Sequence, residues 1–152
     1  VKLGDGVKLG DGVTLGDWVK LGDGVRLGDG VKLGDGVTSD ALNEALIAAL
    51  PDSFEAWKWV RPNRTSPNFD GGTVVEYPFG ATIRAEGQRS DQQCAPGLHV
   101  LRAGYRPEWA GLCEADHDLI CLRVLVRREH VLFGGMPGND AKLRVSDLVV
   151  LS

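Results

Sequence analysis

The sequence predicts a mainly β fold in which a short coil of parallel strands is followed by a small α+β domain. Three observations lead to this prediction. Residues 1–36 are six copies of a six-residue unit, and one amphipathic stretch follows at 39–50. The remaining chain alternates strand-like apolar runs with turns rich in glycine and proline. We therefore expect a repeat at 1–37, a capping or linking helix at 38–51, and an α+β domain at 52–152.

The repeat unit, written "VKLGDG" in its commonest form, is a strand followed by a corner. Val1 and Leu3 are two positions apart, so they point to one side of an extended segment while Lys2 points to the other. The Gly-Asp-Gly step favours a corner because glycine adopts positive φ angles without strain. The apolar spacing does not fit a helix, and the glycines do not follow the period of collagen.

Three corners close a triangle, and the repeat resembles the hexapeptide-repeat, left-handed parallel β-helix family. Leu3, Gly4 and Val7, with their successors, match the aliphatic, small and β-branched positions of that family's unit. The resemblance implies two turns in which Lys2 lies over Lys20. Many members are acyltransferases with a histidine at a subunit boundary. The first histidine here lies outside the repeat, so the resemblance implies a shape rather than an activity.

Two turns bury little apolar surface and leave strand edges unpaired. We expect self-association of the coil as a homotrimer together with capping by the following domain, and further repeats upstream are an alternative. Trp18 replaces a corner glycine and is a candidate interface residue, as are Leu42 and Leu46 of the expected helix. A cation held by the corner aspartates is the alternative to a solvated charged surface.

The helix after the repeat is expected to begin at the cap residues Ser39 and Asp40 and to end at Pro51. Its predicted apolar face consists of Leu42, Ala45, Leu46, Ala49 and Leu50. Strands are predicted at 56–60, 73–77, 81–85, 98–101, 119–126 and 142–151, with a second short helix around 107–112.

A second resemblance rests on "CAPGLHV" and the later "KLRV". Together with the surrounding strands at 56–151, these segments resemble a family of uncharacterised phage and bacterial domains with a C-x2-G-L-H-V motif. Cys94, Gly97, His99, Lys142 and Arg144 are the matching positions. The resemblance implies a shared fold and brings no activity with it.

Cys94 and His99 are the centre of every chemical interpretation of this domain. In the structural one, Cys94 packs as a small apolar residue and His99 binds a backbone carbonyl. We expect no cofactor; the alternative is zinc held by Cys94, His99, Cys113 and His117. Two enzyme alternatives remain. Cys94 is a nucleophile activated by His99, or an ADP-ribosyltransferase-like site uses His99 with Glu129 or Glu76.

Composition and net charge narrow the range of binding partners and cellular locations that we expect. The net charge is -4 and the basic residues form no cluster, which argues against binding to nucleic acid or to an anionic membrane. No apolar run is long enough to span a bilayer, and the odd number of cysteines, 3, favours a reducing compartment. We expect a cytoplasmic protein, with a phage particle as the alternative. The leading hypothesis is a non-enzymatic assembly or binding protein whose coil displays three α+β domains, with another protein as a further partner.

Overall fold

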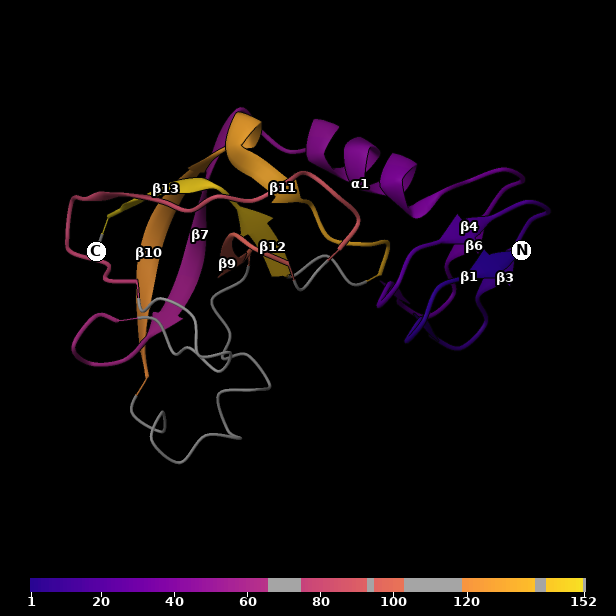
Figure 1. The fold of residues 1–152 in the computed structure, drawn as a ribbon, viewed down its shortest axis with the longest axis horizontal. Coiled ribbons are helices and arrows are strands. Elements are labelled where there is room, and N and C mark those ends of the chain that lie inside the picture. The colour runs from indigo at the N-terminus through magenta and orange to yellow at the C-terminus, as the bar shows by residue number, and fades with distance from the viewer. Residues whose placement is uncertain (66–74, 93–94, 103–118, 139–141, 152) are drawn as a thin grey trace.

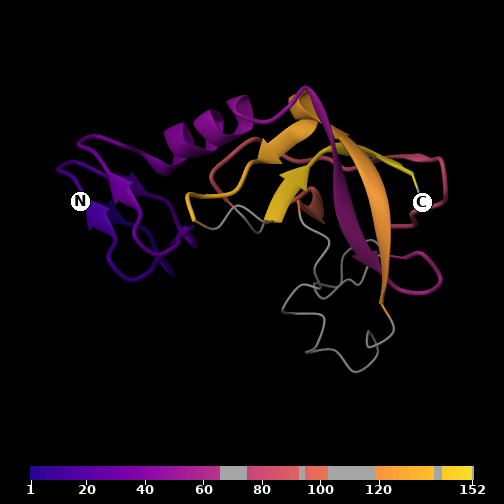
Figure 2. The same ribbon diagram turned by 180° about the vertical axis from the view of Figure 1, so that it is seen from behind.

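The protein is elongated, with a coil at one end and a sheet domain at the other (Figures 1 and 2). The computed structural model describes residues 1–65, 75–92, 95–102, 119–138 and 142–151. The N-terminus lies in the coil and the C-terminus at the far end of the sheet domain. Between them runs one helix, α1 (Ser39–Ala48). The predicted fold class is confirmed: a short parallel hexapeptide segment, then a helix and a seven-stranded antiparallel sheet.

The coil has two turns of three very short strands. The first turn contains β1 (Lys2–Leu3), β2 (Lys8–Leu9) and β3 (Thr14–Leu15). The second contains β4 (Lys20–Leu21), β5 (Arg26–Leu27) and β6 (Lys32–Leu33). Each strand of the first turn pairs in parallel with its counterpart in the second, so that Lys2 lies beside Lys20, Lys8 beside Arg26 and Thr14 beside Lys32. The stacking predicted from the six-residue period is confirmed.

The interior of the coil is closed at one end by the sheet domain. Phe133, the last residue of strand β11 (Val131–Phe133), and Met136, three residues later, are 2% exposed and pack against the leucines and valines of the second turn. Leu42 of α1 packs partly against the same cluster. At the other end, Leu3 and Leu9 of the first turn are 48% and 41% exposed. The expected capping by the following domain is therefore present at one end of the coil.

The N-cap of α1 lies one residue before the predicted cap residues. Thr38 is the N-cap, and its Oγ1 accepts a hydrogen bond from the N–H of Ala41 at 3.2 Å. Ser39 and Asp40, expected as caps, are instead the first two residues of the helix.

The buried face of α1 also differs from the predicted one. Ser39, Asn43 and Ile47 are its buried residues, whereas Ala45 and Ala49 of the predicted apolar face are exposed. The prediction was right for Leu50, which is buried, and wrong for the two alanines, because two of the buried residues are polar and are held by hydrogen bonds to the sheet domain. Apolar spacing alone gives no sign of such contacts.

The sheet domain is a single seven-stranded sheet with the order β11-β12-β9-β7-β10-β13-β8. Its strands are β7 (Ser53–Val60), β8 (Thr82–Arg84), β9 (Leu98–Leu101), β10 (Ile120–Arg127), β11 (Val131–Phe133), β12 (Lys142–Val145) and β13 (Asp147–Val150). A short 3-10 helix, η3 (Arg128–His130), separates β10 from β11. All neighbouring strands run antiparallel.

Most predicted strands correspond to observed ones, with three differences. The run at 142–151 forms two strands interrupted at Ser146. Strand β11 was not predicted, because only three residues follow η3 before the glycine-rich segment. Within the predicted strand at 73–77, the described residues contribute one isolated bridge, between Thr65 and Glu76. The second helix predicted at 107–112 lies outside the described residues.

One face of the sheet carries the main core. Alternating residues of β7, β9, β10 and β12 are buried, and Ala56, Val100, Val124 and Leu143 are at most 2% exposed. Ile47 and the nearby Leu50 join this cluster from the helix side. The helix α1 therefore contacts two separate cores, that of the coil through Leu42 and that of the sheet through Ile47.

Candidate functional site

The corners of the coil are held by one hydrogen bond that occurs three times. The N–H of an aspartate in the first turn donates to the carboxylate of the aspartate 18 residues later. The pairs are Asp5 with Asp23 at 2.8 Å, Asp11 with Asp29 at 2.7 Å and Asp17 with Asp35 at 2.7 Å. The stacked aspartates, which the sequence presents as like charges, are therefore joined by backbone-to-carboxylate contacts.

Each of these contacts requires the glycine that precedes the aspartate. A Cβ placed on Gly16 would lie 2.5 Å from Oδ1 and 2.6 Å from the backbone nitrogen of Asp35. Gly4 and Gly10 are crowded in the same way by the aspartates above them. The Leu-Gly-Asp order of the repeat is thus a packing requirement of the next turn.

Asp91 of the sheet domain continues this pattern beyond the second turn. A Cβ on Gly22 would clash with Oδ2 of Asp91, as a Cβ on Gly4 would clash with Oδ1 of Asp23. The N–H of Gly22 donates to Oγ of Ser39 at 2.8 Å, and the Ser39 hydroxyl donates to the Asp91 carboxylate. Asp91, only 9% exposed, therefore occupies the place that an aspartate of a third turn would take.

A second corner is covered by the glycine-rich segment after β11. The N–H of Gly28 donates to the carbonyl of Pro137 at 3.0 Å, and a Cβ on Gly28 would lie 2.6 Å from the Cα of Gly138. At the third corner, Gly34, no described atom would lie within 4 Å of such a Cβ. The domain thus covers two of the three corners at this end.

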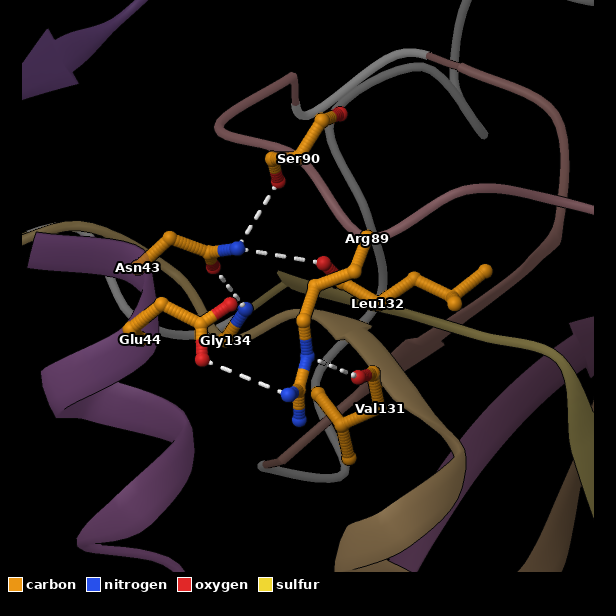
Figure 3. A network of polar contacts seen from close by, with 7 residues as sticks. All are labelled: Asn43, Glu44, Arg89, Ser90, Val131, Leu132 and Gly134. Carbon is orange, nitrogen blue, oxygen red and sulfur yellow. Dashed lines mark hydrogen bonds and ion pairs between the residues drawn. The ribbon is translucent and has the colours of Figure 1, made fainter. Parts of the chain in front are cut away.

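Asn43 joins α1 to the sheet domain through three hydrogen bonds (Figure 3). Its Nδ2 donates to the carbonyls of Ser90 at 2.8 Å and Leu132 at 3.1 Å, and its Oδ1 accepts from the N–H of Gly134 at 2.8 Å. Asn43 is 1% exposed, so these contacts replace water for both ends of the amide. Arg89 binds Glu44 on the exposed side of this network, at 3.3 Å.

Arg144 holds the segment between β8 and β9 from the other side. Its guanidinium donates to the carbonyls of Gln92 at 3.1 Å and Pro96 at 2.8 Å and to Oγ of Ser90 at 2.9 Å. The residue is fully buried and all three partners are neutral, and burial lowers the pKa of the guanidinium. Arg144 is therefore part of the structural support of the segment that leads to the candidate Cys94.

His99, a candidate catalytic and metal-binding residue, lies opposite Arg144 in the β9–β12 pair. Its Nε2 is 3.2 Å from the carbonyl of Ala95. Burial, followed by the charges of Lys142 and Lys58, lowers the pKa of His99 from 6.5 to about 4. The ring is therefore neutral at pH 7 and can donate its Nε2 proton to that carbonyl.

Lys58 lies close to the backbone of His99. Its Nζ donates to the His99 carbonyl at 2.8 Å and lies 5.5 Å from the centre of the Tyr77 ring. Burial, with a smaller contribution from Lys142, lowers the pKa of Lys58 from 10.5 to about 8. A lowered pKa is typical of catalytic lysines. The hydrogen bond to the His99 carbonyl and the contact with the Tyr77 ring also account for the position of Lys58 as part of the fold.

Glu129, the third candidate catalytic residue, lies on η3 and is not brought to His99, whose neighbour across the sheet is Arg144. Its carboxylate is 67% exposed and lies 3.9 Å from Arg127 and 3.7 Å from His130. It lines an open cleft of about 680 Å³ formed by Glu44, Ile47, Ala48, Asp52, Ser53, Arg89, Arg127, Arg128 and Glu129. The three arginines of the cleft face three carboxylates, so its charges are balanced.

The other candidate ligands, Cys94, Cys113 and His117, lie outside the described residues. Within the described part of the chain, no three histidine, cysteine or acidic side chains come together as a metal site would require. Zinc binding and a Cys94 nucleophile stay predictions. No helix among the described residues has the length and apolar character of a membrane span.

The candidate interface residues have different surroundings. Trp18 is 78% exposed and has a φ of 64°, the left-handed region that the repeat elsewhere reserves for glycine. Leu42 is half-buried against the coil core within the same chain, and Leu46 is half-buried on the same helix.

Two residues of the junction, Asn43 and Asp91, were not predicted from the sequence. Asn43 carries a detectable signal, because asparagine is unfavourable inside a helix unless its side chain finds partners. It also follows Ser39 by four residues, on one helix face. Asp91 carries no such signal, since its partners Ser39 and Gly22 are far away in the sequence.

The chain is thus a hexapeptide β-helix segment joined to a separate sheet domain. The family model described as bacterial transferase hexapeptide (six repeats) matches residues 1–38. No curated protein matches the chain. No solved structure matches it either. The similarity covers the coil and the N-cap of α1, and the family of the sheet domain is not identified.

We predict that Gly16→Ala lowers the free energy of unfolding by roughly 1–3 kcal/mol, because the new methyl group displaces Asp35. Gly34→Ala is the matched control. It is the same position one turn later, with open space around it. It should be neutral or slightly stabilising. Urea unfolding followed by circular dichroism measures both, and equal losses would contradict the corner contact.

We predict that Asn43→Ala lowers the free energy of unfolding by about 2–4 kcal/mol, because the Ser90 carbonyl and the Gly134 N–H lose the amide partner and the Leu132 carbonyl keeps only the Ser90 N–H. Glu44→Ala, the next residue, should change it by less than about 1 kcal/mol, since its ion pair with Arg89 is half-exposed. Chemical unfolding of the two variants side by side tests this contrast. A large loss for both would contradict the assignment to the amide contacts, since alanine favours the helix more than either residue it replaces.

We predict that His99 makes the protein less stable in mild acid. Its pKa is about 4 when folded and 6.5 in the reference state, so the unfolded chain binds more protons between these values. The contribution of neutral His99 to the free energy of unfolding is therefore fully present above pH 6.5. It falls by at most about 3 kcal/mol as the pH decreases toward 4. His99→Gln, which keeps a donor for Ala95, should flatten urea midpoints between pH 4.5 and 7. An unchanged slope would disprove the assignment.

Proposed function

We propose that this is an assembly protein in which three copies join through the hexapeptide coil and display their sheet domains. Trp18 is the observation that carries the proposal. A residue other than glycine at this φ lowers the stability of the fold by about 1–2 kcal/mol. The indole is exposed, so its packing within the chain does little to offset this loss. Burial of the indole against a neighbouring copy would offset both effects.

The repeat unit that contains Trp18 also differs at its outward strand position. In "VTLGDW", Thr14 stands where the other five units carry lysine or arginine. On the other two flanks of the coil, cation stacks on cation, as in Lys2 beside Lys20. The flank that carries Thr14 and Lys32 has half that charge. It is therefore the flank that another copy can approach with the least repulsion.

Charge complementarity favours a contact between different surfaces of two copies. The corner at Trp18 carries the carboxylates of Asp17 and Asp35, and the lysine-bearing flanks offer cations to both the carboxylates and the indole. Such a contact uses two different patches, so it forms a ring when the rotation between copies closes. The flanks of a three-cornered coil differ by about 120°, which closes after three copies.

The position of the sheet domain is compatible with display. The coil and the C-terminal part of the domain lie at opposite ends of the molecule (Figures 1 and 2). A ring of coils would leave the three domains outside the contact. The domains would then be presented together to a common partner, which increases binding through effective concentration.

We predict that Trp18→Gly converts a trimer into single chains without weakening the fold. Glycine restores the repeat and removes the strained φ, so each chain should be at least as stable as before. Light scattering measures the native mass, and urea unfolding at low concentration measures the fold.

Phe79→Ala is the matched control, since Phe79 is an equally exposed aromatic, at 74%, in the turn before β8. It should leave the mass unchanged, whereas Thr14→Lys, which restores the cation, should weaken assembly. A single-chain mass for the unaltered protein would sink the proposal. Equal loss of assembly in the Phe79 variant would point to unspecific apolar contact.

A further inference from the structure

The two edges of the seven-stranded sheet differ in what covers them. At the β11 edge, the Leu132 carbonyl accepts hydrogen bonds from the N–H of Ser90 at 3.2 Å and from Nδ2 of Asn43 at 3.1 Å. At the other edge lies β8, the last strand in the order of the sheet. Within the described ranges, β13 is the one strand that pairs with β8. The rest of the chain therefore closes one edge, and the outer side of β8 is open.

The pairing with β13 determines which backbone groups of β8 point outward. The carbonyl of Ala81 and the N–H of Ala85 form hydrogen bonds with β13 and the residue before it, at 2.9 and 2.8 Å. Alternate residues of an antiparallel strand bond to the same neighbour, so Ile83 also bonds to β13. The residues between them, Thr82 and Arg84, direct their N–H and C=O groups to the opposite side. The open edge therefore offers two donors and two acceptors.

The side chains of β8 differ between the two faces of the sheet. Ile83 packs partly against the sheet core, as does Ala85. Thr82 and Arg84 are exposed on the opposite face. Nε of Arg84 lies 3.0 Å from the carboxylate of Asp147, the residue opposite it on β13, and the Arg84 side chain is 79% exposed. The guanidinium keeps further N–H donors for a second carboxylate on its open side.

The order of these side chains defines the segment that fits beside β8. The residue opposite Arg84 should be acidic, because opposite charges on neighbouring strands attract. The residue opposite Ile83 should be apolar, since it extends the core face, and the one opposite Thr82 should be β-branched. On its paired side, β8 already meets this order in Asp147, Leu148 and Val149.

A second copy of this chain does not meet all of these requirements. In one antiparallel register of two β8 strands, each Arg84 lies opposite Thr82 of the other copy and gains no carboxylate. In the register that places Glu86 opposite Arg84, the outward backbone groups of Thr82 have no partner. Each register leaves either the charge or the backbone of the edge unsatisfied.

We propose that the outer edge of β8 binds an extended segment of another protein, which pairs antiparallel with β8 and carries acidic, apolar and β-branched residues in that order. Hydrogen bonds to Thr82 and Arg84 supply the affinity, and the carboxylate at Arg84 fixes the register. The edge is separate from the proposed trimer contact at Trp18. It is also the edge opposite β11, whose Phe133 packs on the coil.

The probe is a blocked peptide with the sequence "SDLVVL", which copies residues 146–151 and places its aspartate opposite Arg84. NMR-detected hydrogen exchange of the full chain measures binding. The Thr82 and Arg84 amides should exchange at least about tenfold more slowly with peptide present, because both gain acceptors. The Ile83 amide should not change, since it is already bonded to β13. The control peptide "SKLVVL" should bind about fivefold more weakly, because it places lysine opposite Arg84.

Two variants separate the edge from other contacts. Thr82→Pro removes an outward N–H that the sheet does not use, so peptide binding should be lost while the urea midpoint changes little. Thr82→Val keeps the N–H and should bind as the unaltered chain does. If the proline variant is unfolded, Arg84→Glu provides the test, because it should reverse the preference and favour "SKLVVL".

Three outcomes would overturn the proposal. Equal affinity for the two peptides would mean that Arg84 does not select the partner. Faster exchange at Ile83 on adding peptide would mean that the peptide displaces β13. Slow exchange at Thr82 and Arg84 without peptide, increasing with protein concentration, would mean that a second copy occupies the edge. The Trp18→Gly variant should bind the peptide with unchanged affinity, so failure of the trimer and failure of the edge site are distinguishable.

Discussion

The hydrogen bond from an aspartate N–H to the aspartate carboxylate of the next turn is the contact on which the coil depends. It places a carboxylate where a side chain on the preceding turn would have to be, so each corner needs glycine before aspartate, as at Gly16 below Asp35. It also runs in one direction along the coil. One end of the coil therefore presents N–H groups and the other presents carboxylates. At the first end, Asp91, a carboxylate from a distant part of the chain, lies against Gly22 and accepts a hydrogen bond from the Ser39 hydroxyl, which itself accepts one from the N–H of Gly22.

The junction between coil and domain is as specific as the coil itself. Asn43 satisfies three backbone groups that come from two separated segments of the sheet domain, and Ser39 links the coil to Asp91. Because these groups are buried, rotation of the coil relative to the sheet would leave several of them without partners. The junction between the coil and the sheet domain is therefore rigid. An assembly built through the coil would therefore set the orientation of each domain as well as its position.

The parts of the structure that could be predicted from the sequence are those that follow from a short repeating pattern of residues. The six-residue period predicts that Lys2 lies beside Lys20, because every layer of such a coil repeats the one before it. The buried face of α1 could not be predicted, since the partners of Asn43 are 47 or more residues away. The same limit applies to the candidate site. His99 stands out in a short motif, but its neighbour Arg144 and its low pKa follow from the pairing of β9 with β12, which no single strand reveals.

The most conspicuous buried polar groups of the described chain are engaged in holding it together, which directs attention to the surface. Arg144 and Asn43 donate hydrogen bonds to backbone carbonyls of neighbouring segments. Trp18 and Leu3, in contrast, are exposed, and both belong to the first turn of the coil. Because Trp18 is exposed on a corner of the coil whereas Asn43 is buried at the junction, a change at Trp18 would alter contacts between copies and leave the fold of each chain intact.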